Sequence, residues 1–179
     1  LVIEAVGAKA TRNAALAAVK PGGVVTHIGL ADWASEIDMR KLTLGEIQKV
    51  RHLEDEYGLN VASIASPIGK VKLVDKPDGT KNTFVPFKQY LAKDVARACE
   101  LAHAFETKLI RGFSFYPPRN SAPADYLEEA VDRIGRIAEA CHRSDLTFGL
   151  EVEANLVGHT GQLLAEIHRR VNHPGLVLV

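Results

Sequence analysis

Strand-like and helix-like segments alternate along most of this chain of 179 residues. Short apolar segments cover residues 60–66, 109–116, 146–153 and 176–179, and segments with apolar residues at helical spacing cover residues 87–106, 123–141 and 160–171. This alternation predicts an α/β fold of parallel β/α units, arranged either as an open sheet or as a (β/α)8 barrel.

A long connection after the first of these strands favours the barrel. Residues 68–86 form it, whereas about 4–6 residues are usual between elements of a compact domain. Its two arms, residues 70–75 and 80–85, flank Pro77-Asp78-Gly79 and are expected to fold as a hairpin over a site. The active face of a barrel is built from such loops.

The first part of the chain has a different character. Residues 1–6 and 23–29 are strand-like, and an Ala-rich helix is expected between them at residues 11–20. Another helix is expected at residues 46–57, ended by Gly58. We therefore expect two domains that meet near Ile47: a partial Rossmann β-α-β unit at residues 1–46 and a partial barrel at residues 47–179.

Composition narrows the choice of partners. The chain has 22 basic and 22 acidic residues and no basic stripe, which argues against nucleic acid. No apolar run approaches the roughly 20 residues needed to span a membrane. Cys99 and Cys141 fall on apolar helix faces without a CxxC spacing, so we expect buried, reduced thiols in a cytoplasmic protein.

The strand at residues 147–153 carries the sharpest chemical pattern. Because side chains alternate across a strand, Phe148 and Leu150 share one face while Glu151 and Glu153 share the other. Inside a barrel a carboxylate is costly to bury unless it is paired or binds a cation, which makes Glu151 a candidate metal ligand. In the alternative interpretation this is a surface strand whose polar face meets water. The local pattern fits both.

Three segments together resemble the sugar phosphate isomerase/epimerase family of xylose-isomerase-like TIM barrels: residues 57–70 (YGLNVASIASPIGK), 110–118 (IRGFSFYPP) and 149–155 (GLEVEAN). The resemblance covers residues 48–179 and implies barrel strands two to five. It implies a divalent metal (Mg, Mn or Zn) and a sugar, sugar phosphate or polyol substrate. Glu151 matches the first carboxylate ligand of the family, and the resemblance places the next ligands beyond Val179. A hard cation can polarise a carbonyl while a carboxylate moves the α-proton, so Glu151 is also the catalytic candidate.

Other residues are candidates for substrate binding. Lys70 on the long loop meets an anionic substrate or is simply solvated, and Tyr116 lines the pocket or packs. Glu153 lies nearer the barrel rim than Glu151. Arg111 needs a partner within its strand, and His159 is interpreted as a histidine of a surface loop.

Residues 1–7 (LVIEAVG) and 19–30 (VKPGGVVTHIGL) resemble the medium-chain, zinc-type alcohol dehydrogenases. By this resemblance the nicotinamide end of NAD(P) is approached by Val6, Gly7, Ile28, Gly29 and Leu30. The phosphate-binding GxGxxG turn and the zinc ligands of that family are expected upstream. The simpler interpretation is two buried strands and a turn without a ligand.

The resemblance over residues 48–179 implies a fragment of a metal-dependent sugar isomerase or epimerase, which we expect to be inactive alone. A fragment of an NAD(P)-dependent alcohol dehydrogenase and a non-catalytic β/α scaffold are the alternatives. We expect a small sugar or polyol as partner, with neither nucleic acid nor membrane. Unpaired strand edges predict a homo-oligomer.

Overall fold

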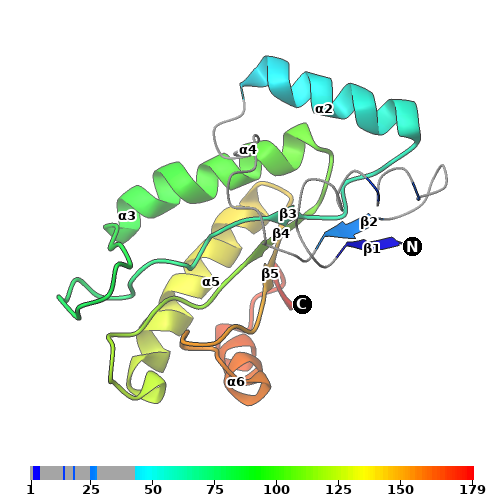
Figure 1. The fold of residues 1–179 in the computed structure, drawn as a ribbon. Helices are drawn as coiled ribbons and strands as arrows, with labels where there is room; N and C mark the ends of the chain where they lie inside the picture. Colours follow the sequence, from blue (N-terminus) through cyan, green and yellow to red (C-terminus); the bar gives the residue numbers. More distant parts are fainter. Residues whose placement is uncertain (1, 5–13, 15–17, 19–24, 28–42) are drawn as a thin grey trace. The chain divides into compact units, whose positions relative to one another are not determined.

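The computed structural model describes residues 2–4, 14, 18, 25–27 and 43–179 (Figure 1). The chain divides into two compact units, Leu1–Val61 and Ala62–Val179, which we describe one at a time. The domain boundary expected near Ile47 falls within a helix of the first unit.

The described residues of the first unit include two short strands and a well-capped helix. Strands β1 (Val2–Glu4) and β2 (Val25–His27) lie within the predicted strand ranges and pair in parallel. Helix α2 (Leu44–Tyr57) begins at a capping box in which the Thr43 side chain accepts a hydrogen bond from the backbone of the third helical residue. It ends at Gly58, whose φ of 62° is the left-handed conformation expected of a glycine cap.

The second unit is built on a four-stranded parallel sheet. Its strands, in spatial order, are β3 (Ile64–Ala65), β4 (Leu109–Gly112), β5 (Thr147–Leu150) and β6 (Leu176–Leu178). Each strand pairs in parallel with the next, and all four lie within the ranges predicted from the sequence. The predicted α/β fold with a parallel sheet is therefore confirmed.

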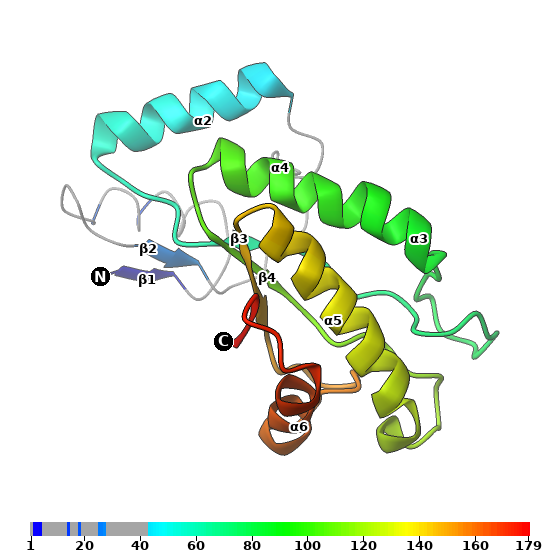
Figure 2. The ribbon, with the colours of Figure 1, turned by 180° about the vertical axis from the view of Figure 1, so that it is seen from behind.

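Helices connect these strands. They are α3 (Phe87–Tyr90), the π-helical η2 (Leu91–Val95), α4 (Ala96–Ala104), the 3-10 helix η3 (Pro123–Tyr126), α5 (Leu127–Arg143) and α6 (Gly161–Val171). Figure 1 and Figure 2 show α4, α5 and α6 on one face of the sheet. Among the described residues, no helix is long and apolar enough to cross a membrane.

This arrangement distinguishes a barrel segment from an open doubly wound sheet. The strand order follows the chain order, and the helices cover a single face. A doubly wound sheet would reverse its strand order at a switch point and carry helices on both faces. The second unit thus has the organisation of consecutive β/α units of a barrel.

The two faces of the sheet differ in burial. Phe148, Leu150 and Ile110 are fully buried on the helix side, where they form the core. On the opposite face, which corresponds to the interior of a barrel, Val177 is 36% exposed and Arg111 is partly exposed. Polar chemistry is therefore available on the barrel-interior face.

The long loop after β3 differs from the expected hairpin. One backbone hydrogen bond joins its arms, from Lys72 N to Thr83 O at 2.8 Å. The first arm instead runs parallel to the extension of β4: Leu73 N donates to Tyr116 O at 2.9 Å and Tyr116 N donates to Val71 O at 3.0 Å. The backbone beyond β4 offers unpaired donors and acceptors, and a nearby segment of the chain satisfies them.

Candidate functional site

Two ion pairs lie at the carboxyl ends of the parallel strands. Arg111 Nε is 3.0 Å from Glu151 Oε2, and Lys70 Nζ is 2.8 Å from Glu153 Oε2. The four side chains are between 28% and 39% exposed, so a solute can reach them. We call these four residues, together with Phe113, the charged cluster.

Phe113 is the apolar base of the charged cluster. Its side chain is 1% exposed. Lys70 Nζ lies 4.2 Å and Arg111 Cζ 4.8 Å from the centre of its ring. Each such contact contributes about 0.5–1 kcal/mol at a partly exposed site. Both cations are thus held between an aromatic ring and a carboxylate.

The register of β4 and β5 explains why Arg111 meets Glu151. Glu151 N donates to Gly112 O at 2.9 Å, so the ladder continues one residue past β5 and keeps Glu151 on the face opposite the core. Arg111 pairs in register with Gly149, which has no side chain to obstruct it. From the sequence, a partner for Arg111 is expected within its own strand. The partner lies instead diagonally across, on the neighbouring strand.

A tight turn positions Lys70. Gly69 has a φ of 86°, and a Cβ there would lie 1.9 Å from Phe113 O, so only glycine fits. Its N–H donates to Tyr90 Oη at 2.8 Å. Burial raises the pKa of Tyr90 to about 12, which keeps this phenol neutral. The buried Tyr90 thus fixes the turn that brings Lys70 to Glu153.

The charges of the cluster suit a neutral ligand rich in hydroxyl groups. Two cations face two carboxylates, so the cluster offers donors and acceptors without net charge. Partly exposed ion pairs contribute about 0–1 kcal/mol each. A ligand can therefore exchange with either partner at small cost.

A metal site is not complete among the residues that the structure describes. In that part of the chain no three His, Cys, Asp or Glu side chains are grouped so that they could hold a metal ion. Glu151 and Glu153 each have a cationic partner. The described residues thus do not fit a divalent metal by themselves, and the predicted metal role of Glu151 stays a prediction.

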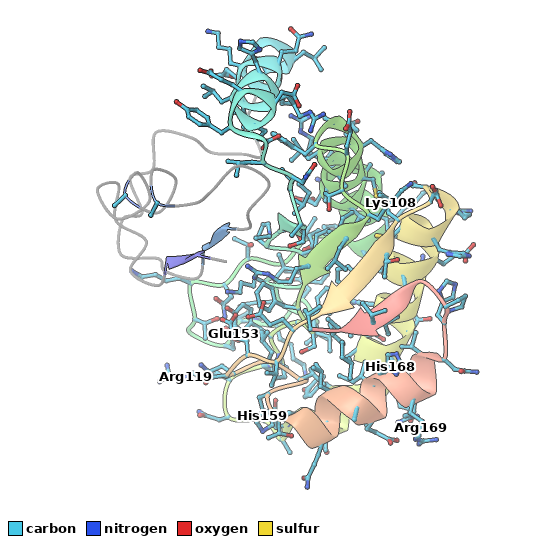
Figure 3. All side chains as sticks on the ribbon, turned by 90° about the vertical axis from the view of Figure 1, so that its right-hand side faces the viewer. Lys108, Arg119, Glu153, His159, His168 and Arg169 are labelled. Atoms are coloured by element: carbon cyan, nitrogen blue, oxygen red, sulfur yellow. The ribbon has the colours of Figure 1, made fainter. Side chains whose placement is uncertain are left out.

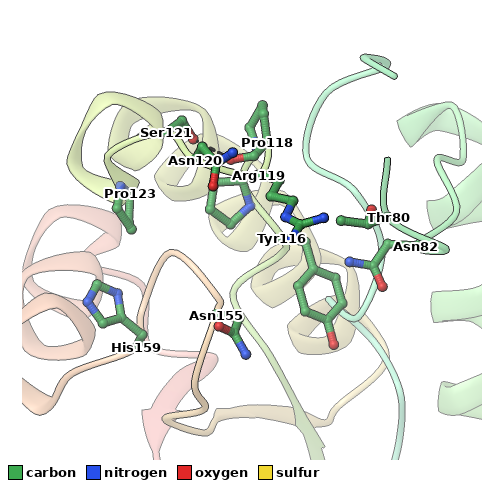
Figure 4. Close-up of a pocket in the computed structure, with 11 residues that line it drawn as sticks. Thr80, Asn82, Tyr116, Pro118, Arg119, Asn120, Ser121, Pro123, Asn155 and His159 are labelled. Carbon is green, nitrogen blue, oxygen red and sulfur yellow. Dashed lines mark hydrogen bonds between the residues drawn. The ribbon is translucent and has the colours of Figure 1, made fainter. Parts of the chain in front are cut away.

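A pocket of about 710 Å³ opens at the same end of the sheet (Figure 4). Residues of three loops line it, within ranges 80–82, 116–123 and 155–159, which follow β3, β4 and β5. Figure 3 shows Glu153, Arg119 and His159 toward this end of the sheet, away from Lys108 at the start of β4. Tyr116 and His159 both line the pocket.

The backbone beside the pocket is strained. Phe115 is fully buried, yet its φ is 69°. A bulky residue in this conformation costs about 1–3 kcal/mol and persists only where its surroundings hold it. Val157 N donates to Phe115 O at 3.0 Å, and the ring packs against Phe87 and Tyr90 at centroid distances of 6.4 and 6.3 Å. This packing sets the direction of the chain at Tyr116.

The predicted site residues fall into three groups. Glu151, Glu153 and Lys70 meet in the charged cluster, and Tyr116 lines the pocket. The residues predicted to approach NAD(P) lie outside the described residues: Val6, Gly7, Ile28, Gly29 and Leu30.

No sequence pattern pointed to Phe113 or Arg119 as site residues, and Arg111 was a weak candidate without an identified partner. A signal existed for Arg111, because it is a charge inside an apolar strand. No pattern distinguished Arg119 from other exposed arginines.

Solved structures with the same fold are numerous but distant. A xylose isomerase-like TIM barrel protein from Mycobacterium smegmatis, in complex with magnesium, matches with a TM-score of 0.57 and 17% identity over 79% of this chain and 47% of that one. D-psicose 3-epimerase from Clostridium cellulolyticum, with D-tagatose, matches with a TM-score of 0.58 and 15% identity over 78% of this chain and 49% of that one. The IOLI protein, with a zinc atom, matches with a TM-score of 0.56 and 10% identity over 78% and 46%. These identities show the fold alone, and the chain spans about half the length of these structures.

The family itself is shown by sequence. No curated protein matches the chain. A family model described as xylose isomerase-like TIM barrel matches residues 25–179. The match begins within the segment that resembled the alcohol dehydrogenases, and that resemblance has no support. The chain belongs to the xylose isomerase-like TIM barrel family.

Proposed function

We propose that this chain carries part of the active face of a sugar isomerase or epimerase. One observation supports the proposal above the others. Glu151 and Glu153, at the carboxyl end of β5, each pair with a cation from a neighbouring strand end or loop, at 3.0 and 2.8 Å. Active residues of barrel enzymes come from this end of the strands.

In this proposal Glu151 acts as the base. Isomerisation or epimerisation of a sugar begins when a proton leaves the carbon next to a carbonyl group. The proton passes to a carboxylate oxygen of Glu151, and the electron pair moves to the carbonyl oxygen. Arg111 donates hydrogen bonds to that oxygen as its charge grows. Return of the proton to the neighbouring carbon gives the isomer, provided that the hydroxyl proton of the carbon that was deprotonated moves to the former carbonyl oxygen. A proton delivered to the opposite face by a second acid, with return of the electron pair from the oxygen, gives the epimer.

Lys70, Glu153 and Tyr116 bind the hydroxyl groups of the sugar in this proposal. Structural relatives that contain magnesium or zinc support a divalent cation as cofactor. Glu151 would contribute one oxygen ligand, with the other ligands outside the described residues.

The test is sugar binding observed residue by residue. We would record ¹H–¹⁵N spectra of the full chain with millimolar D-tagatose, the sugar present in the epimerase structure, with and without Mg²⁺. We expect shifts at the amides of Arg111, Glu151 and Glu153 that Glu151→Gln abolishes. Glu166→Gln is the matched control, because Glu166 is a partly exposed carboxylate paired with Arg169 on α6.

Two outcomes would contradict the proposal. Shifts spread over the surface without a maximum at the charged cluster would argue against a sugar site. Equal effects of the Glu151 and Glu166 substitutions would argue against Glu151. Either result would favour a non-catalytic β/α scaffold.

A further inference from the structure

We infer that the pocket beyond β4 binds an anionic group of the substrate, a phosphate or a carboxylate, through the guanidinium of Arg119. This inference rests on the proposed function, because it names the class of sugar. It concerns a residue outside the charged cluster.

Arg119 is the unpaired arginine of the second unit. Every other arginine in residues 43–179 forms an ion pair with an Asp or Glu side chain. Arg119 forms none, although it lines the pocket. Figure 4 shows its guanidinium directed toward Thr80 and Asn82 on the facing loop. A guanidinium that faces a pocket without a carboxylate partner is available for an anionic ligand.

The rest of the lining also suits an anion. Hydroxyl, amide and imidazole side chains line the pocket together with Arg119, and no Asp or Glu is among them. The ring of His159 contacts the Leu156 carbonyl through Nδ1 at 3.2 Å. Because a carbonyl only accepts, the proton of this contact is on Nδ1. No carboxylate of the pocket lining therefore competes with an anionic ligand for the guanidinium of Arg119.

The carboxylate of Asp78 contacts the loop at residues 117–122, which we call the Arg119 loop, but the charge of Asp78 is already compensated. Lys72 Nζ lies 2.7 Å from Asp78 Oδ1, and Thr80 donates to the same oxygen from N and Oγ1 at 3.1 and 2.7 Å. These hydrogen bonds, with that from Lys72 the strongest, hold the pKa of Asp78 well below its usual range. Asp78 Oδ2 accepts from the backbone N of Arg119 at 3.3 Å. Asp78 therefore positions Arg119 and leaves its guanidinium free.

The Arg119 loop is held in place before any ligand arrives. Ser121 Oγ donates to Pro118 O at 2.6 Å, and Asn120 adopts a φ of 63°. The proline and these contacts restrict the backbone on both sides of Arg119. A loop ordered in advance loses less entropy on binding, which favours a specific anion site over a casual surface contact.

Calorimetric titration of the full chain with D-tagatose 6-phosphate, D-galacturonate and D-tagatose, at matched ionic strength, tests this inference. We expect at least one anionic sugar to bind about tenfold more tightly than D-tagatose, because a charge-assisted hydrogen bond is stronger than a neutral one. Arg119→Gln should remove that advantage and leave D-tagatose binding unchanged. The sugar whose advantage is lost identifies the group as a phosphate or a carboxylate.

Arg143→Gln is the control, because Arg143 is an exposed arginine on α5 whose side chain is 74% exposed. Circular dichroism would verify that both variants are folded. The inference is overturned if neither anionic sugar binds more tightly than D-tagatose. It is also overturned if none of the three sugars binds. Equal losses in the two variants would overturn it as well. Failure of the proposed function is distinguishable, since Glu151→Gln then has no effect while the Arg119 effect persists.

Discussion

The turn at Gly69 provides the sharpest test of how the site is built. Replacing Gly69 with Ala has two costs. A non-glycine residue at a φ of 86° costs about 1–2 kcal/mol. The new Cβ would also lie 1.9 Å from Phe113 O, and relieving such crowding typically costs about 1–3 kcal/mol. We therefore expect Gly69→Ala to lower the free energy of unfolding by about 2–5 kcal/mol.

Gly79→Ala separates the two costs. Gly79 has a φ of 71°, but no atom lies within 4 Å of a Cβ placed there. It should lose only the conformational part, about 1–2 kcal/mol. Urea unfolding followed by circular dichroism measures both variants. If the two variants lost the same free energy of unfolding to within about 0.5 kcal/mol, the close approach to Phe113 O would not constrain the turn at Gly69.

Three further predictions concern charged and buried groups. The pKa of Tyr90 is about 12 in the folded protein and 10 in an unfolded chain, so the stability from its burial is present below pH 10 and is lost as pH rises to about 12. This loss of unfolding free energy amounts to about 3 kcal/mol between pH 10 and pH 12. Tyr90→Phe should not show it. An equal loss of unfolding free energy in both proteins over this pH range would refute the prediction. Mn²⁺ should broaden the amide signal of Glu151 in ¹H–¹⁵N spectra at lower concentration than that of Glu166, and Glu151→Gln should abolish the difference; uniform broadening would exclude a preferred site. Because the pKa of Asp78 is lowered in the folded protein, its contribution to stability is present above its unfolded pKa and is lost as pH falls. Asp78→Asn should therefore make the free energy of unfolding less dependent on pH in the acid range. Coinciding acid limbs of the two unfolding curves would contradict this.

Local patterns predicted the elements of the second unit well. The strands β4 and β5 and the helices α5 and α6 lie within or close to the predicted ranges. Thr160 caps α6, because its side chain accepts a hydrogen bond from Leu163 N. Such features depend on residues a few positions apart, so sequence periodicity and capping preferences reveal them.

Other features carried no local signal. The helix predicted at residues 87–106 contains the π-helical segment η2, and the long loop pairs with Tyr116 where a hairpin was expected. The buried Phe115 adopts a positive φ that its sequence context does not favour. Each of these depends on contacts with segments far away in the chain.

The sequence alone predicted that Glu151 lies on the face of its strand opposite Phe148, because side chains alternate across a strand. Only the tertiary structure decided which groups meet Glu151 and Glu153. Strand order and register bring Arg111 to Glu151, and the Gly69 turn brings Lys70 to Glu153. A pattern within one strand sets the direction of a side chain, whereas its partner depends on how distant strands pack together.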